Sequence, residues 1–349
     1  MFTNIGLPNL GNTCYSNSII QILSEFKELD LVSISAMKQG IDEKQYVMCN
    51  NILNLIKEIK RGSPKKSTLV QMFVSIACKY PEFGHGQHDQ NEFLNIVFST
   101  LHDCLSVPLT MQIIQNTNLT PNDKLELKSF NNLRMEGSIV HGTNSVRTDN
   151  DILLNSPIYQ HFTGQLLART KCANKNCGYI SSTFDIFRTL EVAINQSCLT
   201  LEDCLAKFTK TTKLSAEDAY ECDKCKTKNE SSIKRQLWKT PDVLVICLKR
   251  FKATNVNNQW TIIKKQQTIT IPDVLDIKPY VCVDRDIVTK YNLVSVAYHI
   301  GQMGDGHCYS SIKKDNTTWY RFNDEDVQEI PHPSDKNAYM LFYRRQGSS

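Results

Sequence analysis

The stretch Asn9-Leu10-Gly11-Asn12-Thr13-Cys14-Tyr15 gives the strongest single indication of how this chain folds, because it places a cysteine where a turn passes into a helix. Gly11-Asn12-Thr13 favours a turn, and the apolar residues after Cys14 repeat at helical spacing. The Cys14 thiol is therefore predicted at a helix N-terminus. The helix dipole and free backbone N–H groups lower the pKa of a thiol there and can stabilise an oxyanion, to which the Asn9 side chain could also donate.

Cys14 has two interpretations on local chemistry alone. A free cysteine is most often a buried small hydrophobic residue, whereas a catalytic thiol needs a base held by a third group. Among the eight histidines, His307 is the preferred base because it ends the glycine-rich turn Gly304-Asp305-Gly306, where the backbone can approach a substrate closely. His299 is the rival, and its place at the end of an apolar stretch favours a structural role.

The segment Trp319–Asp324 supplies candidates for the third group. A strand here could return either Asn323 or Asp324 to the histidine. A neutral amide can orient an imidazole but stabilises imidazolium less than a carboxylate does. The residues alone leave these two alternatives open.

Periodicity divides the chain into a helical part and a strand-rich part. Before residue 105, apolar residues repeat at helical spacing after Cys14 and within segments 52–59, 69–76 and 94–101. Segment 106–158 is rich in Asn, Asp, Ser and Thr, and is interpreted as a mostly surface insertion with a helix near 123–135.

Strand signals dominate after Tyr159. Val243–Leu248 is an unbroken apolar run, typical of a strand buried on both faces, and Leu293–Tyr298 is a second apolar stretch. Thr268–Ile271 alternates as a half-buried strand does. Helices first and strands later predict an α+β architecture of packed layers.

Two cysteine pairs, Cys172-x4-Cys177 and Cys222-x2-Cys225, have the spacing of a four-thiolate zinc site. A short turn can aim two thiolates at one ion, and four protein ligands leave no open position, so the zinc would be structural. The alternatives are four unrelated thiols, or a redox motif at Cys222 and Cys225, which lacks the surrounding βαβ pattern.

Composition limits the function classes. The 349 residues carry a net charge of only +4, which gives no support to nucleic-acid or membrane-surface binding. No secretory signal and no transmembrane stretch is apparent. Thirteen cysteines, an odd number in a chain long enough to bury its own core, indicate a reducing compartment, cytosol or nucleus.

In their order along the chain, these motifs resemble the ubiquitin-specific protease family, papain-like cysteine peptidases shaped as fingers, palm and thumb. The matching blocks are Gly6–Tyr15, Gln87-His88-Asp89 with Glu92-Phe93-Leu94, Pro241–Phe251, Tyr291–His299, Gly306-His307 and Trp319–Asp324. They run from residue 6 to 343 in the family's order, which is far more specific than any one motif. Cys308 departs from the pattern, since a tyrosine usually follows the histidine.

The resemblance implies a deubiquitinating thiol protease that cleaves after the C-terminal glycine of ubiquitin. Cys14 would be the nucleophile and His307 the general base. Asn323 would take the third position of the triad, with Asp324 as another source of charge, and Asn9 would donate to the oxyanion. The alternatives are a non-catalytic ubiquitin-binding module and a protease for another ubiquitin-like modifier.

The resemblance also implies binding sites. Asp89 and Glu92 would receive basic residues of the ubiquitin tail; the less favoured alternative is an ordinary helix N-terminus with acidic residues in its first turn. The four paired cysteines would hold structural zinc in the fingers, and no catalytic cofactor is expected. Ubiquitin and ubiquitinated proteins are the expected partners, without nucleic acid or membrane.

One catalytic domain is expected over residues 1–349. A helical thumb would span about 1–105, the variable insertion about 106–158, the fingers and the start of the palm about 159–250, and the palm with the histidine box about 251–345. The oligomeric state is left open.

Overall fold

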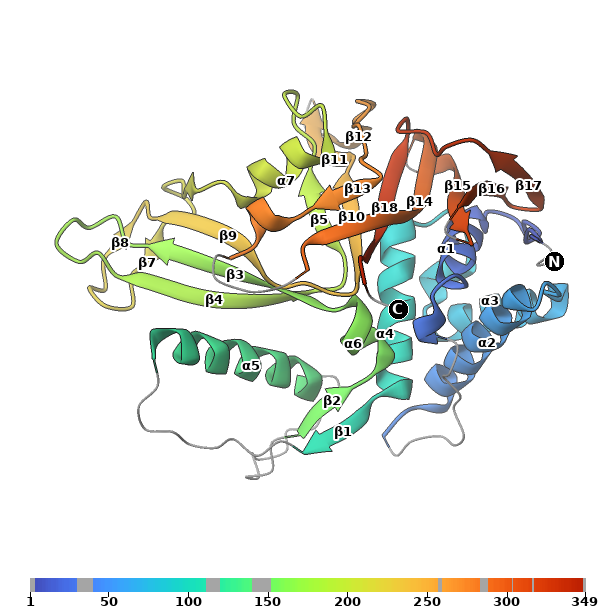
Figure 1. Cartoon of the computed structure of the whole chain (residues 1–349), viewed down its shortest axis with the longest axis horizontal. Coiled ribbons are helices and arrows are strands. Elements are labelled where there is room, and N and C mark those ends of the chain that lie inside the picture. Colours follow the sequence, from blue (N-terminus) through green and yellow to red (C-terminus); the bar gives the residue numbers. More distant parts are fainter. Residues whose placement is uncertain are drawn as a thin grey trace.

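The computed structural model describes residues 4–29, 40–110, 120–139, 152–256, 259–282, 288–302, 304–315 and 317–347. Within them the chain forms a helical lobe, a central sheet and a long narrow sheet that projects away from both (Figure 1). Helices dominate the first part and strands the second, so the predicted α+β class is confirmed. Of the helices in these residues, none is long and apolar enough to cross a membrane.

Four helices build the helical lobe and coincide with the four predicted apolar repeats. They are α1 (Cys14–Leu23), α2 (Glu43–Lys60), α3 (Lys66–Lys79) and α4 (Gln90–Leu105), joined by the short 3-10 helices η1 (Lys27–Leu29) and η2 (Pro81–Gly84). α2 stops just before Gly62, whose φ of 67° lies in the left-handed region that glycine adopts readily. The apolar sides of these helices share one hydrophobic core with the central sheet.

The central sheet has eight strands, seven of them in the order β17-β16-β15-β14-β18-β10-β5, with β13 beside β14. The strands are β5 (Leu190–Ala193), β10 (Val243–Lys249), β13 (Val274–Asp276), β14 (Lys290–Gln302), β15 (Asp305–Lys314), β16 (Thr318–Asn323), β17 (Asp326–Ile330) and β18 (Ala338–Arg345). Only the β10–β5 pair is parallel.

β10 explains why residues 243–248 are apolar without interruption. Successive strand residues point to opposite faces. Val243, Val245 and Cys247 enter the core shared with the helical lobe, whereas Leu244, Ile246 and Leu248 enter a second core under α7 (Leu201–Thr209) and η3 (Lys278–Tyr280). The predicted strand buried on both faces is therefore confirmed.

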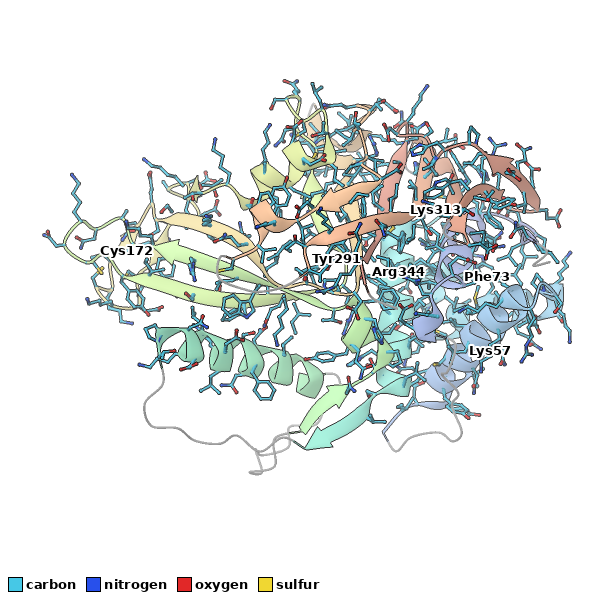
Figure 2. The ribbon with its side chains drawn as sticks, in the orientation of Figure 1. Lys57, Phe73, Cys172, Tyr291, Lys313 and Arg344 are labelled. Carbon is cyan, nitrogen blue, oxygen red and sulfur yellow. The ribbon has the colours of Figure 1, made fainter. Side chains whose placement is uncertain are left out.

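The projecting sheet, here called the finger sheet, has the strand order β4-β3-β9-β6. Its strands are β3 (Gly164–Lys171), β4 (Ile180–Phe187), β6 (Thr212–Lys213) and β9 (Ser232–Lys239), and a small hairpin of β7 (Tyr220–Glu221) and β8 (Lys228–Asn229) lies at its tip. Figure 2 shows Cys172 at this far end, well away from the helical lobe that carries Phe73.

The segment at 106–158 is only partly described. β1 (Val107–Thr110) pairs with β2 (Ile152–Asn155). α5 (Pro121–Ile139) packs against the finger sheet, below it in Figure 1, and includes the helix that was predicted near 123–135. Residues 111–119 and 140–151 of the predicted insertion lie outside the described residues. α6 (Pro157–Phe162) then leads into β3.

One strand prediction is wrong. Thr268–Ile271 has the predicted alternation of burial, with Ile269 and Ile271 inside, but it forms only an isolated bridge between Thr270 and Thr200. The preceding hairpin of β11 (Phe251–Val256) and β12 (Gln259–Lys264) stands apart from the central sheet. Alternation reports which side chains are buried, and it cannot report whether a partner strand runs alongside.

Candidate active site

Cys14 is the first residue of α1, as predicted. The preceding turn places Gly11 at φ 96° and Asn12 at φ 58°, both in the left-handed region. The Thr13 carbonyl accepts the first backbone N–H bonds of the helix, and the Thr13 hydroxyl accepts a hydrogen bond from the Leu10 N–H at 2.9 Å. This turn fixes the Cys14 thiol at the positive end of the helix dipole.

His307 and Asn323 come from neighbouring antiparallel strands, β15 and β16. His307 Nε2 lies 2.5 Å from Asn323 Oδ1. Because an amide oxygen only accepts, Nε2 carries the hydrogen, and the other ring nitrogen, Nδ1, is left for the thiol. The structure thus brings together the predicted nucleophile, base and orienting residue.

The ionisation of the two main groups is shifted in opposite directions. The pKa of the Cys14 thiol is lowered to about 5, chiefly by a hydrogen bond from the Cys308 side chain and then by His307, against the opposing effect of burial. The pKa of His307 is raised to about 9, first by its hydrogen bond with Cys14 and further by Asn323 and the charge of Asp324. Between these values the pair is favoured as thiolate and imidazolium.

Asp324 does not take the place of Asn323 beside the histidine ring. Its carboxylate instead accepts hydrogen bonds from Asn9 Nδ2 at 3.0 Å and Asn17 Nδ2 at 2.8 Å, while its backbone oxygen accepts from Leu7 N–H at 2.9 Å. The contacts of Asn9 Oδ1 with two backbone N–H groups leave its NH₂ facing this carboxylate. Asp324 thus fixes the N-terminal segment and acts on His307 through its charge.

His299 lies on β14 and lines the same small cavity as Cys14, of about 40 Å³. Burial lowers its pKa to about 4, so its ring is neutral at physiological pH. It packs edge-on against Phe251 at a ring-centroid separation of 5.0 Å. These features support the structural interpretation of His299.

Asp89 and Glu92 open α4. Asp89 is the N-cap: its Oδ1 accepts from the N–H groups of Asn91 and Glu92 at 2.8 and 3.0 Å, and its Oδ2 accepts from the Tyr339 hydroxyl at 2.6 Å. The alternative interpretation, an ordinary helix N-terminus, therefore accounts for the capping contacts of Asp89 but not for its contact with Tyr339. Glu92 is exposed.

Two contributors, Gln87 and Asn17, were given no role from the sequence. Gln87 Oε1 accepts a hydrogen bond from Gly306 N–H at 2.8 Å and so ties the loop before α4 to the loop before His307. Asn17, one helical turn after Cys14, anchors Asp324. Asn17 is only 2% exposed. The sequence signal for it was a polar residue on the buried side of an otherwise apolar helix, where a polar side chain needs a hydrogen-bond partner.

The four paired cysteines converge at the tip of the finger sheet, and their sulfur atoms all lie within 4.8 Å of one another. Cys172 and Cys225 sulfurs are 3.8 Å apart, and Cys177 and Cys222 sulfurs 3.7 Å apart. Within the sequence, Cys172 and Cys177 are joined by one tight turn, and Cys222 and Cys225 by another. The second turn ends at Lys226, whose φ is 55°. This donor set could hold a metal ion.

Comparisons with known proteins agree with these features. A family model described as ubiquitin carboxyl-terminal hydrolase matches residues 5–343. Probable ubiquitin carboxyl-terminal hydrolase 4 of Schizosaccharomyces pombe is 27% identical over 366 residues, which cover 98% of this chain and 58% of the relative. Usp2 of Drosophila melanogaster is 28% identical over 348 residues, which cover 97% of this chain and 34% of the relative. The chain thus spans about half the length of the curated relatives it matches.

Solved structures share the fold. The SAGA Ubp8/Sgf11/Sus1/Sgf73 DUB module bound to ubiquitin aldehyde matches with a TM-score of 0.73 at 20% identity, over 99% of this chain and 70% of that chain. A helical lobe that places a cysteine thiol against a histidine on a sheet is the arrangement of a cysteine protease. Within that class, the chain belongs to the ubiquitin carboxyl-terminal hydrolase family of deubiquitinating cysteine proteases.

Proposed function

We propose that this chain is a deubiquitinating thiol protease that hydrolyses the isopeptide or peptide bond after the C-terminal glycine of ubiquitin. The observation that carries the proposal is the arrangement of Cys14, His307 and Asn323, in a chain of this family. The opposed pKa shifts favour a reactive thiolate at neutral pH. The ubiquitin aldehyde bound by a structural neighbour supports ubiquitin as the substrate.

In the proposed reaction the Cys14 thiolate attacks the carbonyl carbon of the C-terminal glycine of ubiquitin. Backbone N–H groups at the start of α1 and the Asn9 amide stabilise the oxyanion. His307 then gives its proton to the leaving lysine amine, and the ubiquitin acyl group remains on sulfur as a thioester. In the second half, His307 takes a proton from water, the resulting hydroxide attacks the thioester, and Cys14 is released.

Asp89 and Glu92 are proposed to bind the basic tail of ubiquitin. Asp89 already accepts three hydrogen bonds, two from backbone N–H groups and one from Tyr339, so its main effect would be to shape and charge this surface. Glu92 is exposed in the first turn of α4 and is the better candidate for direct contact with an arginine. Replacement Glu92→Gln is expected to raise KM for ubiquitin substrates more than it lowers kcat.

The ion at the four-cysteine cluster is proposed to be zinc, in a structural role. Four Zn–S bonds of about 2.3 Å in a tetrahedron place the sulfurs about 3.8 Å apart, which fits the observed 3.8 and 3.7 Å. Asn229 Nδ2 donates to the Cys172 sulfur at 3.4 Å and would orient that ligand. A reducing intracellular compartment is proposed as well, and the thirteen free thiols support it.

The decisive experiment is reaction of the purified chain with ubiquitin that carries a C-terminal electrophile, read by intact mass. Wild type should gain one ubiquitin, and Cys14→Ala should gain none. Cys78→Ala is the matched control, because Cys78 is an exposed cysteine on α3, and it should react as wild type does.

The alternatives give different outcomes in the same assay. A protease for another modifier would leave the ubiquitin probe unreacted and form an adduct with a probe made from that modifier. A non-catalytic ubiquitin-binding module would bind ubiquitin yet form no adduct. An adduct that persists in Cys14→Ala would show that the assigned nucleophile is wrong.

A further inference from the structure

The catalytic cavity contains a second thiol that the proposed mechanism does not use. Cys308 follows His307 on β15 and lines the same cavity as Cys14. The two cysteines are 3% and 4% exposed, belong to one hydrophobic cluster and carry free thiols. Both side chains line this one cavity, and the Cys308 side chain and backbone N–H are among the groups that lower the pKa of Cys14, so the two thiols are neighbours.

Their environments give the two thiols different reactivity. The hydrogen bond from Cys308 is the largest cause of the lowered pKa of Cys14, and the same hydrogen bond is the largest cause that raises the pKa of Cys308. Cys14 is thus the thiolate, and Cys308 retains its proton. Oxidants attack thiolates faster than thiols, so Cys14 is oxidised first.

We propose that Cys14 and Cys308 are a redox pair, in which Cys308 resolves the sulfenic acid that hydrogen peroxide forms on Cys14. The Cys14 thiolate attacks one peroxide oxygen, so an S–O bond forms, the O–O bond breaks, and hydroxide leaves and takes up a proton to become water. The Cys308 sulfur then attacks the Cys14 sulfur. The S–S bond forms, the S–O bond breaks, and a second water leaves with the Cys308 proton.

The first step prepares the second. A sulfenic acid is largely uncharged, so oxidation of Cys14 removes the thiolate that held the proton on Cys308. His307 directly precedes Cys308 in the chain and hydrogen-bonds to Cys14. Once Cys14 is no longer a thiolate, the His307 ring can pass the Cys308 proton to the hydroxide that leaves Cys14. The disulfide blocks the nucleophile reversibly and prevents further oxidation to sulfinic and sulfonic acids, which thiols do not reverse.

The test treats the reduced, purified chain with hydrogen peroxide and maps its peptides without reduction. Wild type should yield a linked pair of peptides that contain Cys14 and Cys308, at a mass lower by two hydrogen atoms, and dithiothreitol should separate them. Cys308→Ser should instead gain two or three oxygen atoms on Cys14, and dithiothreitol should not reverse this. Cys78→Ser, at an exposed site, should behave as wild type does.

Two results would overturn the proposal. One is a peroxide-treated wild type in which Cys14 carries oxygen or is linked to another cysteine, with no Cys308 peptide attached. The other is a Cys308→Ser variant whose Cys14 recovers fully with dithiothreitol. The peptide map of peroxide-treated wild type tests the proposed disulfide by itself, even if the Cys308→Ser variant folds poorly. Because the readout is mass, it is independent of whether ubiquitin is the substrate.

Discussion

Replacement of Asp324 by Asn isolates the contribution of one carboxylate to the proposed catalytic site. Asp324 lies at φ 51° in a turn, and Asn tolerates this left-handed conformation as well as Asp does, so the backbone should be kept. The carboxylate accepts hydrogen bonds from both Asn9 and Asn17. An amide has only one oxygen, so one of the two bonds is lost and an NH₂ group then faces another NH₂ group.

The expected loss follows from the kind of bond removed. A hydrogen bond to a charged group contributes about 1.5–3 kcal/mol. Asn9 is exposed and Asp324 is only half-buried, so the lower end applies. With Asn9 as an oxyanion donor, about 1.5 kcal/mol is lost from the transition state, which corresponds to a fall of slightly more than about tenfold in kcat/KM.

Asp324→Asn should also change the pKa of His307, and this change distinguishes an electrostatic role of Asp324 in the site from a general loss of protein stability. The pKa of His307 is raised first by Cys14 and to a lesser extent by the charge of Asp324. Loss of that negative charge favours neutral imidazole, so the His307 pKa falls and the alkaline limb of the pH–rate profile moves to lower pH.

The assay is hydrolysis of a fluorogenic C-terminal amide of ubiquitin across a range of pH. Asp326→Asn is the matched control, because Asp326 is exposed on the same hairpin and contacts Gln328 at 3.0 Å rather than the N-terminal segment. An Asp324→Asn variant with kcat/KM within a factor of about two of wild type and an unmoved alkaline limb would refute the reasoning.

Three further outcomes are expected. Wild-type kcat/KM should rise as Cys14 ionises near pH 5 and fall as His307 loses its proton near pH 9, and a pH–rate profile without these limbs would contradict the assigned ion pair. Treatment with a metal chelator, or Cys225→Ser, should lower Tm, because binding of the proposed zinc is coupled to folding, and Cys225→Ser should abolish the bound metal measured by atomic emission. Gly6→Ala should lower Tm by several degrees, because its Cβ would meet a backbone oxygen at 2.2 Å, whereas Gly84→Ala, with a nearest contact of 3.4 Å, should not.

Local sequence was sufficient for the elements that local forces determine. Apolar repeats predicted the helices of the lobe, and the run at 243–248 predicted β10, because burial on two faces requires apolar residues at every position. Cysteine spacing predicted the cluster, since the turns within each pair are short. For the third group, the residues alone left Asn323 and Asp324 open, and only the family resemblance favoured Asn323. The structure brings Asn323 to His307 because their strands are neighbours in one sheet.

Long-range contacts were harder to predict. Asn323 and Asp324 are adjacent, and only the turn at φ 51° decides that one carboxylate points away from the histidine toward Asn9. The bond from Gly306 to Gln87 joins residues 219 apart, and no periodicity reports such a pairing. Cys308 and Cys14 line one cavity although they are far apart in the sequence, and no periodicity predicts that proximity either.

The two halves of the proposed site come from opposite regions of the chain: Asn9 and Asp324 are 315 residues apart and hydrogen-bonded. During synthesis the nucleophile therefore leaves the ribosome long before its base. Until β15 and β16 have emerged and docked against α1, the Cys14 thiol lacks His307 and Cys308 and keeps an ordinary thiol pKa. The unfinished polypeptide therefore carries the Cys14 thiol in an unactivated form until these strands dock against α1.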